Sequence, residues 1–179
     1  GTGYHNQKWA TERKVEDKKE GYDFPIIRYA EVLLNYAEAV YERDDKISNT
    51  DLNISLNLVR LRVNPAMTPL TNELITQNAG MDMRTEIRRE RTIELFNEGF
   101  RLDDLKRWKT AEMPMDIVGI QWKGTEYEKV WANCPYETNA EGCIIIEKGR
   151  KWEEKNYLFP LPSDQLQLNP NLQQNPGWE

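Results

Sequence analysis

The chain has 179 residues and a net charge of −6 at pH 7, and 30% of its residues are charged and 39% hydrophobic. This length suits one domain with a sizeable core, and the acidic balance argues against a protein whose main contacts are nucleic-acid phosphates. No apolar run approaches the roughly 18 residues of a membrane span. The first residues have neither a basic start nor an apolar stretch, so we expect a cytoplasmic chain or a mature or truncated piece.

Residues 1–24 are polar and charged and predict an extended or poorly packed lead-in, which a single helical domain follows over residues 25–179. The first helix begins soon after Pro25, where two neighbouring apolar stripes recur with helical spacing. The stripes are Tyr29, Leu33, Tyr36 and Val40, and beside them Ala30, Leu34, Ala37 and Tyr41. We therefore expect this helix to be largely buried and interpret its aromatic residues as core.

Start and stop signals predict four further helices. One starts after Thr50 or Asp51, ends at residues 64–65 and is expected to bury Leu52, Leu56, Val59 and Val63. Thr71 caps a short helix that Gly80 ends, and Asp82 caps a highly charged helix that Gly99 ends. A last short helix runs to about residue 108. The succession predicts a mainly α fold of antiparallel helix pairs.

The charged block at residues 90–108 needs partners for its carboxylates. Glu86, Glu90, Glu94 and Glu98 recur every fourth residue and would form one stripe of like charge on a helix. The chain lacks the ligands of a carboxylate-bridged metal centre, because it has one histidine, His5, and no Glu-x-x-His motif. Arginines are plentiful, so we predict a structural ion network rather than a catalytic carboxylate pair. Its members are Glu90, Arg91, Glu94, Glu98, Arg101, Asp104 and Arg107.

Residues 113–156 have no helical period and predict a loop-rich insertion with a small β-hairpin, in which residues 143–147 pair with residues 129–131. Its dispersed aromatic residues either contact the flat face of a ligand such as a sugar ring or form the insertion's own small core. These residues are Trp122, Tyr127, Trp131, Tyr136 and Trp152. Cys134 and Cys143 could form a local disulfide in an exported protein and would be free thiols in a reducing compartment.

The C-terminal segment contains too many prolines for a long helix. Pro160 and Pro162 favour an extended path, and a short helical turn is expected over residues 163–168. Leu158, Phe159 and Leu161 are apolar and are expected to be buried. We therefore predict an extended strap that lies across the helices.

Four parts of the sequence, in this order, resemble the C-terminal portion of the SusD/RagB family. They are residues 28–39, residues 56–62, the block at residues 90–108, and residues 157–162 with the Asn-Pro at 169–170 and the Gln-Asn-Pro-Gly at 174–177. The resemblance implies a tetratricopeptide-like helical scaffold. It also implies a non-enzymatic surface lipoprotein of Bacteroidetes that binds glycans, or in some cases peptides, and works with a TonB-dependent outer-membrane transporter.

Family members are much longer, so the resemblance implies that this chain is the scaffold-forming C-terminal part of an outer-membrane, surface-exposed nutrient-uptake protein. The family's N-terminal lipid anchor is not expected within it, and neither Cys134 nor Cys143 is a candidate for that anchor. No cofactor, metal or nucleic-acid partner is expected. No motif here corresponds to a family ligand site.

Two other functions stay open from the residues alone. An all-α glycoside hydrolase would need two carboxylates in an open groove without arginine partners, chosen from Glu86, Glu90, Glu94, Glu98, Asp103 and Asp104. A helical-repeat adaptor that binds peptides would need a concave groove lined by polar side chains, for which Asn35 and Asn57 are the best candidates.

Overall fold

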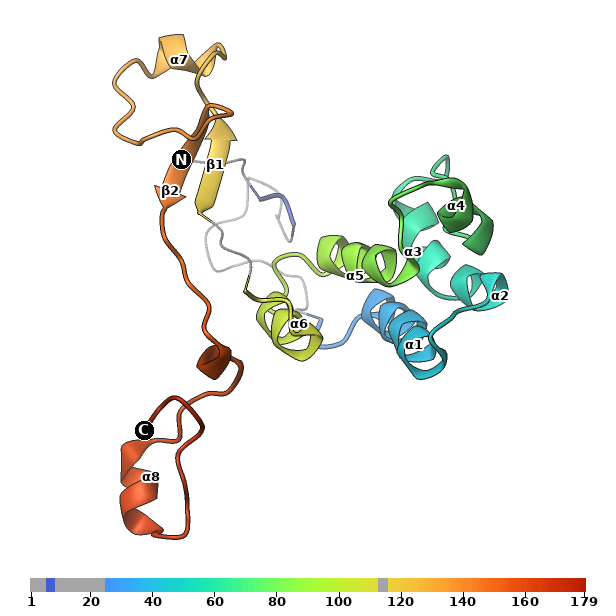
Figure 1. Cartoon of the computed structure of the whole chain (residues 1–179). Coiled ribbons are helices and arrows are strands. Elements are labelled where there is room, and N and C mark those ends of the chain that lie inside the picture. Colours follow the sequence, from blue (N-terminus) through green and yellow to red (C-terminus); the bar gives the residue numbers. More distant parts are fainter. Residues whose placement is uncertain (1–5, 9–24, 113–115) are drawn as a thin grey trace. The chain divides into compact units, whose positions relative to one another are not determined.

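The structure is a computed structural model that describes residues 6–8, 25–112 and 116–179 (Figure 1). His5 and most of the polar lead-in expected over residues 1–24 lie outside the described residues. The chain divides into two compact units, Thr11–Leu102 and Gly1–Ala10 with Asp103–Glu179, and we describe each by itself. The expectation of a single domain over residues 25–179 stays a prediction. None of the described helices is both long enough and apolar enough to cross a membrane.

The first unit, called the helical unit below, contains short helices whose starts follow local capping signals. Its helices are α1 (Tyr29–Asp44), α2 (Asn49–Asn53), α3 (Leu56–Val63), α4 (Asn72–Gln77) and α5 (Met83–Glu94). The predicted caps are confirmed: Thr71 accepts a hydrogen bond from the Leu74 N–H at 3.1 Å, and Asp82 accepts one from the Thr85 N–H at 2.9 Å. Such caps satisfy backbone donors that have no partner inside the helix.

The second predicted helix was wrong in its extent, because the structure divides it into α2 and α3. The start lies earlier than expected, since Ser48 accepts from the Asp51 N–H at 3.0 Å. At the division, Ser55 has φ −133° and ψ −99°, and its hydroxyl donates to the Asp51 carbonyl. A serine side chain that binds a nearby carbonyl competes with the helical hydrogen bonds, which explains the break.

Helix α5 also ends earlier than predicted, at Glu94 rather than at Gly99. Asn97 already adopts the left-handed conformation with φ 60°, two residues before Gly99 with φ 89°. Asparagine is one of the few residues that adopt this conformation readily. Glu98 therefore lies in a turn, and Phe96, which was expected to anchor the helix, is exposed.

The core of the helical unit lies between α1, α3 and α5. Its largest fully buried apolar side chains are Leu34, Leu52, Leu56, Leu70 and Ile87, and each such burial contributes about 1.5–3 kcal/mol. The expectation that α1 is largely buried was wrong for one face, because Tyr29 is 71% exposed and Tyr36 is also exposed. Val63, at the end of α3, is exposed as well.

Helices α1 and α5 run antiparallel, as their ion pairs show. Arg28, which precedes α1, pairs with Glu94 at the end of α5 at 2.9 Å. Glu42, near the end of α1, pairs with Arg84 at 3.2 Å and Arg88 at 3.0 Å, both near the start of α5. The predicted antiparallel helix pairing is thus confirmed for these two helices.

Helix α6 (Arg101–Trp108) begins at the end of the helical unit and continues into the second unit. The second unit then contains β1 (Ile117–Gln121), α7 (Tyr127–Val130), β2 (Cys143–Glu147), the 3₁₀ helix η1 (Glu154–Tyr157) and α8 (Ser163–Leu168). Together the two units confirm a mainly α fold with a small antiparallel β element.

The predicted partner of β2 was wrong. β2 pairs with β1, in a register that places Val118 opposite Ile145 and Gln121 opposite Cys143. Residues 129–131 belong to α7 and its end instead. Residues 117–121 are rich in β-branched side chains, so the strand signal is present in the sequence. The choice between two apolar segments as the partner depends on contacts that a local pattern does not encode.

The C-terminal strap, residues 157–179, folds back on itself. Gln174 accepts from the Leu161 N–H at 2.7 Å and donates to the Leu161 carbonyl at 3.0 Å. The Trp178 indole N–H donates to the carbonyls of Lys155 at 2.9 Å and Leu158 at 3.1 Å. Contrary to expectation, Leu158 and Phe159 are exposed, although the predicted turn over residues 163–168 is confirmed as α8. That the strap lies across the helices stays a prediction.

Candidate functional site

The segment between β1 and β2, residues 122–142, extends from a closed base and is called the excursion. The backbone N–H groups of Trp122 and Lys123 both donate to the Gly142 carbonyl, at 2.8 Å and 3.0 Å. Gly142 has φ 79°, and a Cβ atom there would lie 3.0 Å from both the Cβ and the carbonyl oxygen of Lys123. Only glycine fits this conformation and this close approach without strain. The base thus fixes where the excursion leaves the sheet.

The excursion contains four of the five aromatic residues predicted to contact a ligand. Trp131 and Tyr136 form an edge-to-face pair, with ring centroids 6.1 Å apart and an interplanar angle of 69°. Tyr136 is 40% exposed, and Tyr127, on α7, is 47% exposed. Trp122 is half-buried. An edge-to-face pair contributes about 0.5–1.5 kcal/mol beyond its buried area. The two rings therefore pack against each other while part of the Tyr136 ring surface stays accessible.

The fifth residue, Trp152, lies in a different cluster. Its ring packs edge-to-face against Tyr157 of η1, with centroids 5.3 Å apart. Its indole nitrogen is buried and has no hydrogen-bond partner among the described residues. Trp152 is thus part of the packing before the strap, away from the pair in the excursion.

The two cysteines flank the end of the excursion but are not joined. Cys134 and Cys143 are both free and half-buried. The disulfide considered for an exported protein is therefore not formed in this structure. The turn just before Cys143 is closed by Asn139, whose side-chain oxygen accepts from the Cys143 N–H at 2.8 Å.

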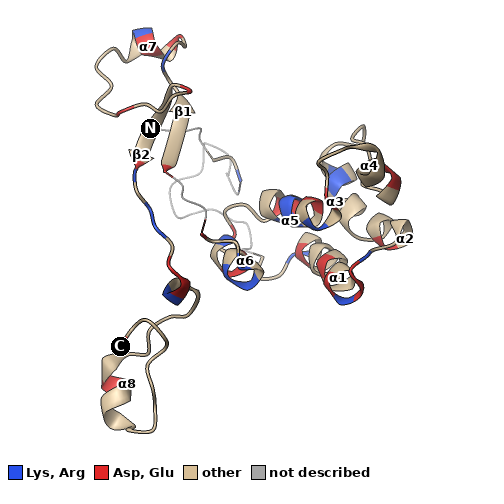
Figure 2. Cartoon of the chain, in the orientation of Figure 1, with Lys and Arg blue, Asp and Glu red and all other residues tan. Residues whose placement is uncertain are grey.

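The glutamates of the charged block are bound by arginines from other helices, and Figure 2 shows acidic and basic residues interleaved along α5. Arg28 binds Glu98 with two hydrogen bonds, Nε to Oε2 at 2.8 Å and Nη2 to Oε1 at 2.7 Å. Glu94 pairs with Arg28 at 2.9 Å and with Arg62 of α3 at 2.8 Å. The bond to Glu98 raises the pKa of Arg28, so the guanidinium stays charged. Sequence reasoning missed Arg28, which lies 70 residues from Glu98.

Glu90 and Arg91 each contact a residue outside the predicted network. Glu90 lies 3.3 Å from Arg60 of α3, and burial raises the pKa of its carboxyl despite this nearby positive charge. Arg91 donates to the Asn35 side-chain oxygen at 2.7 Å, and its guanidinium lies 5.4 Å from the centroid of the Phe100 ring. Asn35 was not predicted to belong to this cluster.

The last three predicted members lie on α6. Arg101 is exposed and donates to the Thr92 hydroxyl at 2.8 Å. Asp104 is buried and pairs with Arg107 at 2.8 Å, one helical turn away. Arg101 and Arg107 are thus both exposed members of the predicted network, and the Asp104–Arg107 pair is local to its own helix.

A glycosidase-type pair of carboxylates requires two acids that face a groove without arginine partners. Glu86, Glu90, Glu94, Glu98 and Asp104 each have an arginine within ion-pair distance, and Asp103 is exposed on the surface. Among the residues that the structure describes, no group of three or more histidine, cysteine or acidic side chains is placed to hold a metal. The raised pKa of Glu90 is therefore explained by burial inside the ion network.

The adaptor hypothesis depended on Asn57 as an exposed groove residue, and this expectation was wrong. Asn57 is buried, donates to the Leu70 carbonyl at 2.9 Å and accepts from the Leu70 N–H at 2.8 Å. The Asn57 side chain thus supplies both hydrogen-bond partners of the Leu70 backbone, in the loop between α3 and α4. Asn35 remains on the surface but is bound to Arg91.

Known protein families and solved structures include relatives of this chain. The sequence model of the SusD family matches residues 1–178. The chain belongs to the SusD family. Two solved structures with similar folds support the assignment, both from Bacteroides fragilis. One is a SusD-like carbohydrate binding protein, with 31% sequence identity, a TM-score of 0.66, and coverage of 83% of this chain and 28% of that one. The other is a SusD-like protein with 27% identity, a TM-score of 0.57, and coverage of 84% and 25%.

This SusD-family chain therefore spans about a quarter of the length of those two relatives. No curated protein is significantly similar to it. Membership of the SusD family confirms the resemblance carried by the charged block and the strap.

Proposed function

We propose that this chain is the scaffold-forming part of a non-enzymatic glycan-binding protein. The whole protein would act at the outer surface of the outer membrane, anchored there by a lipid, and deliver its ligand to a TonB-dependent transporter. Membership of the SusD family supports this role, as does a similar solved structure that is described as a carbohydrate binding protein. The ion pairing of the acids in the charged block supports a structural rather than catalytic use of those carboxylates.

Within this chain, the observation that carries the proposal is the aromatic pair Trp131–Tyr136 on the excursion. Sugar rings have apolar faces that pack on aromatic rings, and rigid aromatic side chains lose little conformational entropy when they bind. Tyr127 presents a further exposed ring in the same excursion. These three residues are the proposed glycan contacts, Trp122 is a supporting residue at the base, and Trp152 is left out.

Titration of the whole chain against a panel of neutral and acidic oligosaccharides and peptides, read by calorimetry, tests this function. We expect one class of glycan to bind, and Trp131→Ala or Tyr136→Ala to weaken that binding by about tenfold. Tyr29→Ala, which changes an exposed tyrosine in the helical unit, serves as the control and should bind normally. Binding of peptides alone, or binding that both excursion variants leave unchanged, would contradict the proposal.

A further inference from the structure

The second unit contains a cavity of about 560 Å³ that none of the aromatic residues predicted to contact a ligand lines. It lies between the end of α6, η1 and the C-terminal turn. Its lining residues are Lys106, Arg107, Lys109, Glu154, Lys155, Tyr157, Leu158 and Pro176. The volume falls in the range of sites that hold small ligands.

The lining is strongly basic, in contrast to the acidic chain as a whole. Four of the lining residues are cationic and one is acidic. Lys109 pairs with Glu154 at 2.6 Å, and Lys155 pairs with Glu153 at 2.9 Å. Lys106 differs from them, because no carboxylate lies within ion-pairing distance of its Nζ among the described residues.

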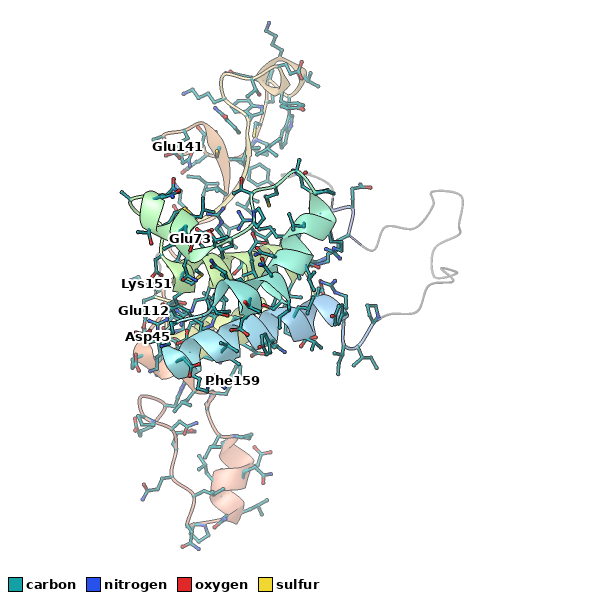
Figure 3. The ribbon with its side chains drawn as sticks, turned by 90° about the vertical axis from the view of Figure 1, so that its right-hand side faces the viewer. Asp45, Glu73, Glu112, Glu141, Lys151 and Phe159 are labelled. Atoms are coloured by element: carbon teal, nitrogen blue, oxygen red, sulfur yellow. The ribbon has the colours of Figure 1, made fainter. Side chains whose placement is uncertain are left out.

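Aromatic rings hold the Lys106 ammonium instead. Its Nζ lies 3.3 Å from the centroid of the Phe159 ring and 6.0 Å from that of Trp152. Phe159, labelled in Figure 3, is 69% exposed. An ammonium has three donors, and an attraction to a ring at an exposed site supplies only about 0.5–1 kcal/mol. The ammonium lies over one face of an exposed apolar ring and therefore retains donors for an anion.

We propose that this cavity binds the anionic group of an acidic saccharide, with Lys106 as the contact to the anion and Phe159 as a platform for the sugar face. The inference rests on the proposed glycan-binding function and specifies its ligand class. A carboxylate or a sulfate would form charge-assisted hydrogen bonds with the ammonium. Lys109 and Lys155 would add a longer-range positive field, and Tyr157 would line the apolar wall.

Matched ligands test the proposal on the whole chain by calorimetry at low salt. The first pair is tetragalacturonate and its fully methyl-esterified form, and the second is a sulfated galactan oligosaccharide and its unsulfated form. We expect at least one acidic ligand to bind about tenfold or more tightly than its neutral counterpart, and salt to reduce that preference. The two pairs distinguish a carboxylate from a sulfate as the recognised group.

Three variants locate the preference. Lys106→Met keeps an unbranched apolar stem without the charge and should abolish the preference for the acidic ligand, whereas Lys106→Arg should keep most of it. Lys151→Met, at an exposed lysine labelled in Figure 3 and outside the cavity lining, is the matched control and should behave as the unchanged chain. Thermal melts establish that each variant is folded.

Equal binding of acidic and neutral ligands overturns this inference and leaves the proposed glycan-binding function standing. A preference that Lys106→Met and Lys151→Met reduce equally overturns it too, because the acid would then be recognised elsewhere. If no saccharide binds at all, the proposed function and the inference fail together.

Discussion

Arg28 and Glu98 are joined by two parallel hydrogen bonds although they lie 70 residues apart in the sequence. One residue precedes α1 and the other follows α5, so the pair ties the entry of one helix to the turn after the other. Both side chains are largely buried, at 15% and 8% exposed. A pair in this environment is expensive to break, because the partner left behind is a buried charge.

The first prediction concerns this pair. Glu98→Ala should lower the free energy of unfolding by about 3 kcal/mol, since it leaves the Arg28 guanidinium without its bidentate partner. Arg101→Ala, on an exposed side chain bound to Thr92, should cost less than about 1 kcal/mol. Urea unfolding followed by circular dichroism measures both. Equal losses for the two variants would mean that the pair is solvated and contributes little.

The second prediction concerns the cap of α5 and pH. Hydrogen bonds from the Thr85 N–H and hydroxyl lower the pKa of Asp82. A lowered pKa in the folded state stabilises the fold above the ordinary aspartate pKa of about 3.9, and this contribution is lost as the pH falls through the folded-state pKa. Asp82→Ala should therefore cost about 1 kcal/mol at pH 7 and less at pH 3.

Asp82→Asn is the control for that experiment, because asparagine caps a helix without ionising. Its stability relative to Asp82→Ala should not change with pH, as measured by thermal melts over the acidic range. A constant difference between the original chain and Asp82→Ala from pH 7 to pH 3 would argue against an ionised cap.

The third prediction concerns Asn57. Asn57→Ala removes both partners of the Leu70 backbone and should destabilise the helical unit by about 2–3 kcal/mol, because two buried polar groups lose their hydrogen bonds. Asn53→Ala removes only the bond between the two side chains, at 2.9 Å, and should cost clearly less. Hydrogen exchange at the Leu70 amide gives a direct measurement, and exchange that stays slow in Asn57→Ala would show that another group protects this amide.

The fourth prediction concerns the strap. Gln174→Ala removes both bonds to Leu161 and should open residues 157–162 to limited proteolysis several-fold faster, while the cleavage pattern of the helical unit stays unchanged. Gln173→Ala, at the exposed neighbouring residue, is the matched control. If both variants are cut at the same rate, the contacts of Asn175 and Trp178 are sufficient to hold the strap.

The sequence predicted best those features that a few neighbouring residues determine. The caps Thr71 and Asp82, the short helix α8 and strand β2 were all placed correctly, because capping and turn chemistry act over three or four residues. Asn97 shows the limit of such signals: it ends α5 before the glycine that seemed the natural stop.

Features that depend on distant segments were predicted poorly. The apolar stripes of α1 were identified, but periodicity does not tell which stripe has a packing partner, and Tyr29 and Tyr36 proved exposed. The repeated glutamates indicated that arginines must form ion pairs with them. Without the fold, however, Arg28 could not be chosen as a partner over arginines that are nearer in the sequence. No local sequence pattern indicated the cavity around Lys106. The aromatic neighbours of Lys106, Trp152 and Phe159, follow 46 or more residues later in the chain.

The closed base of the excursion bears on how binding specificity could change. Because the Gly142 carbonyl accepts two hydrogen bonds from the opposite side of the base, we expect residues 124–136 to tolerate changes in length and sequence while the strands keep their register. New recognition surfaces could then be grafted there without redesign of the helices. Exchange of this segment between relatives would be a direct route to proteins that capture different ligands on one unchanged frame.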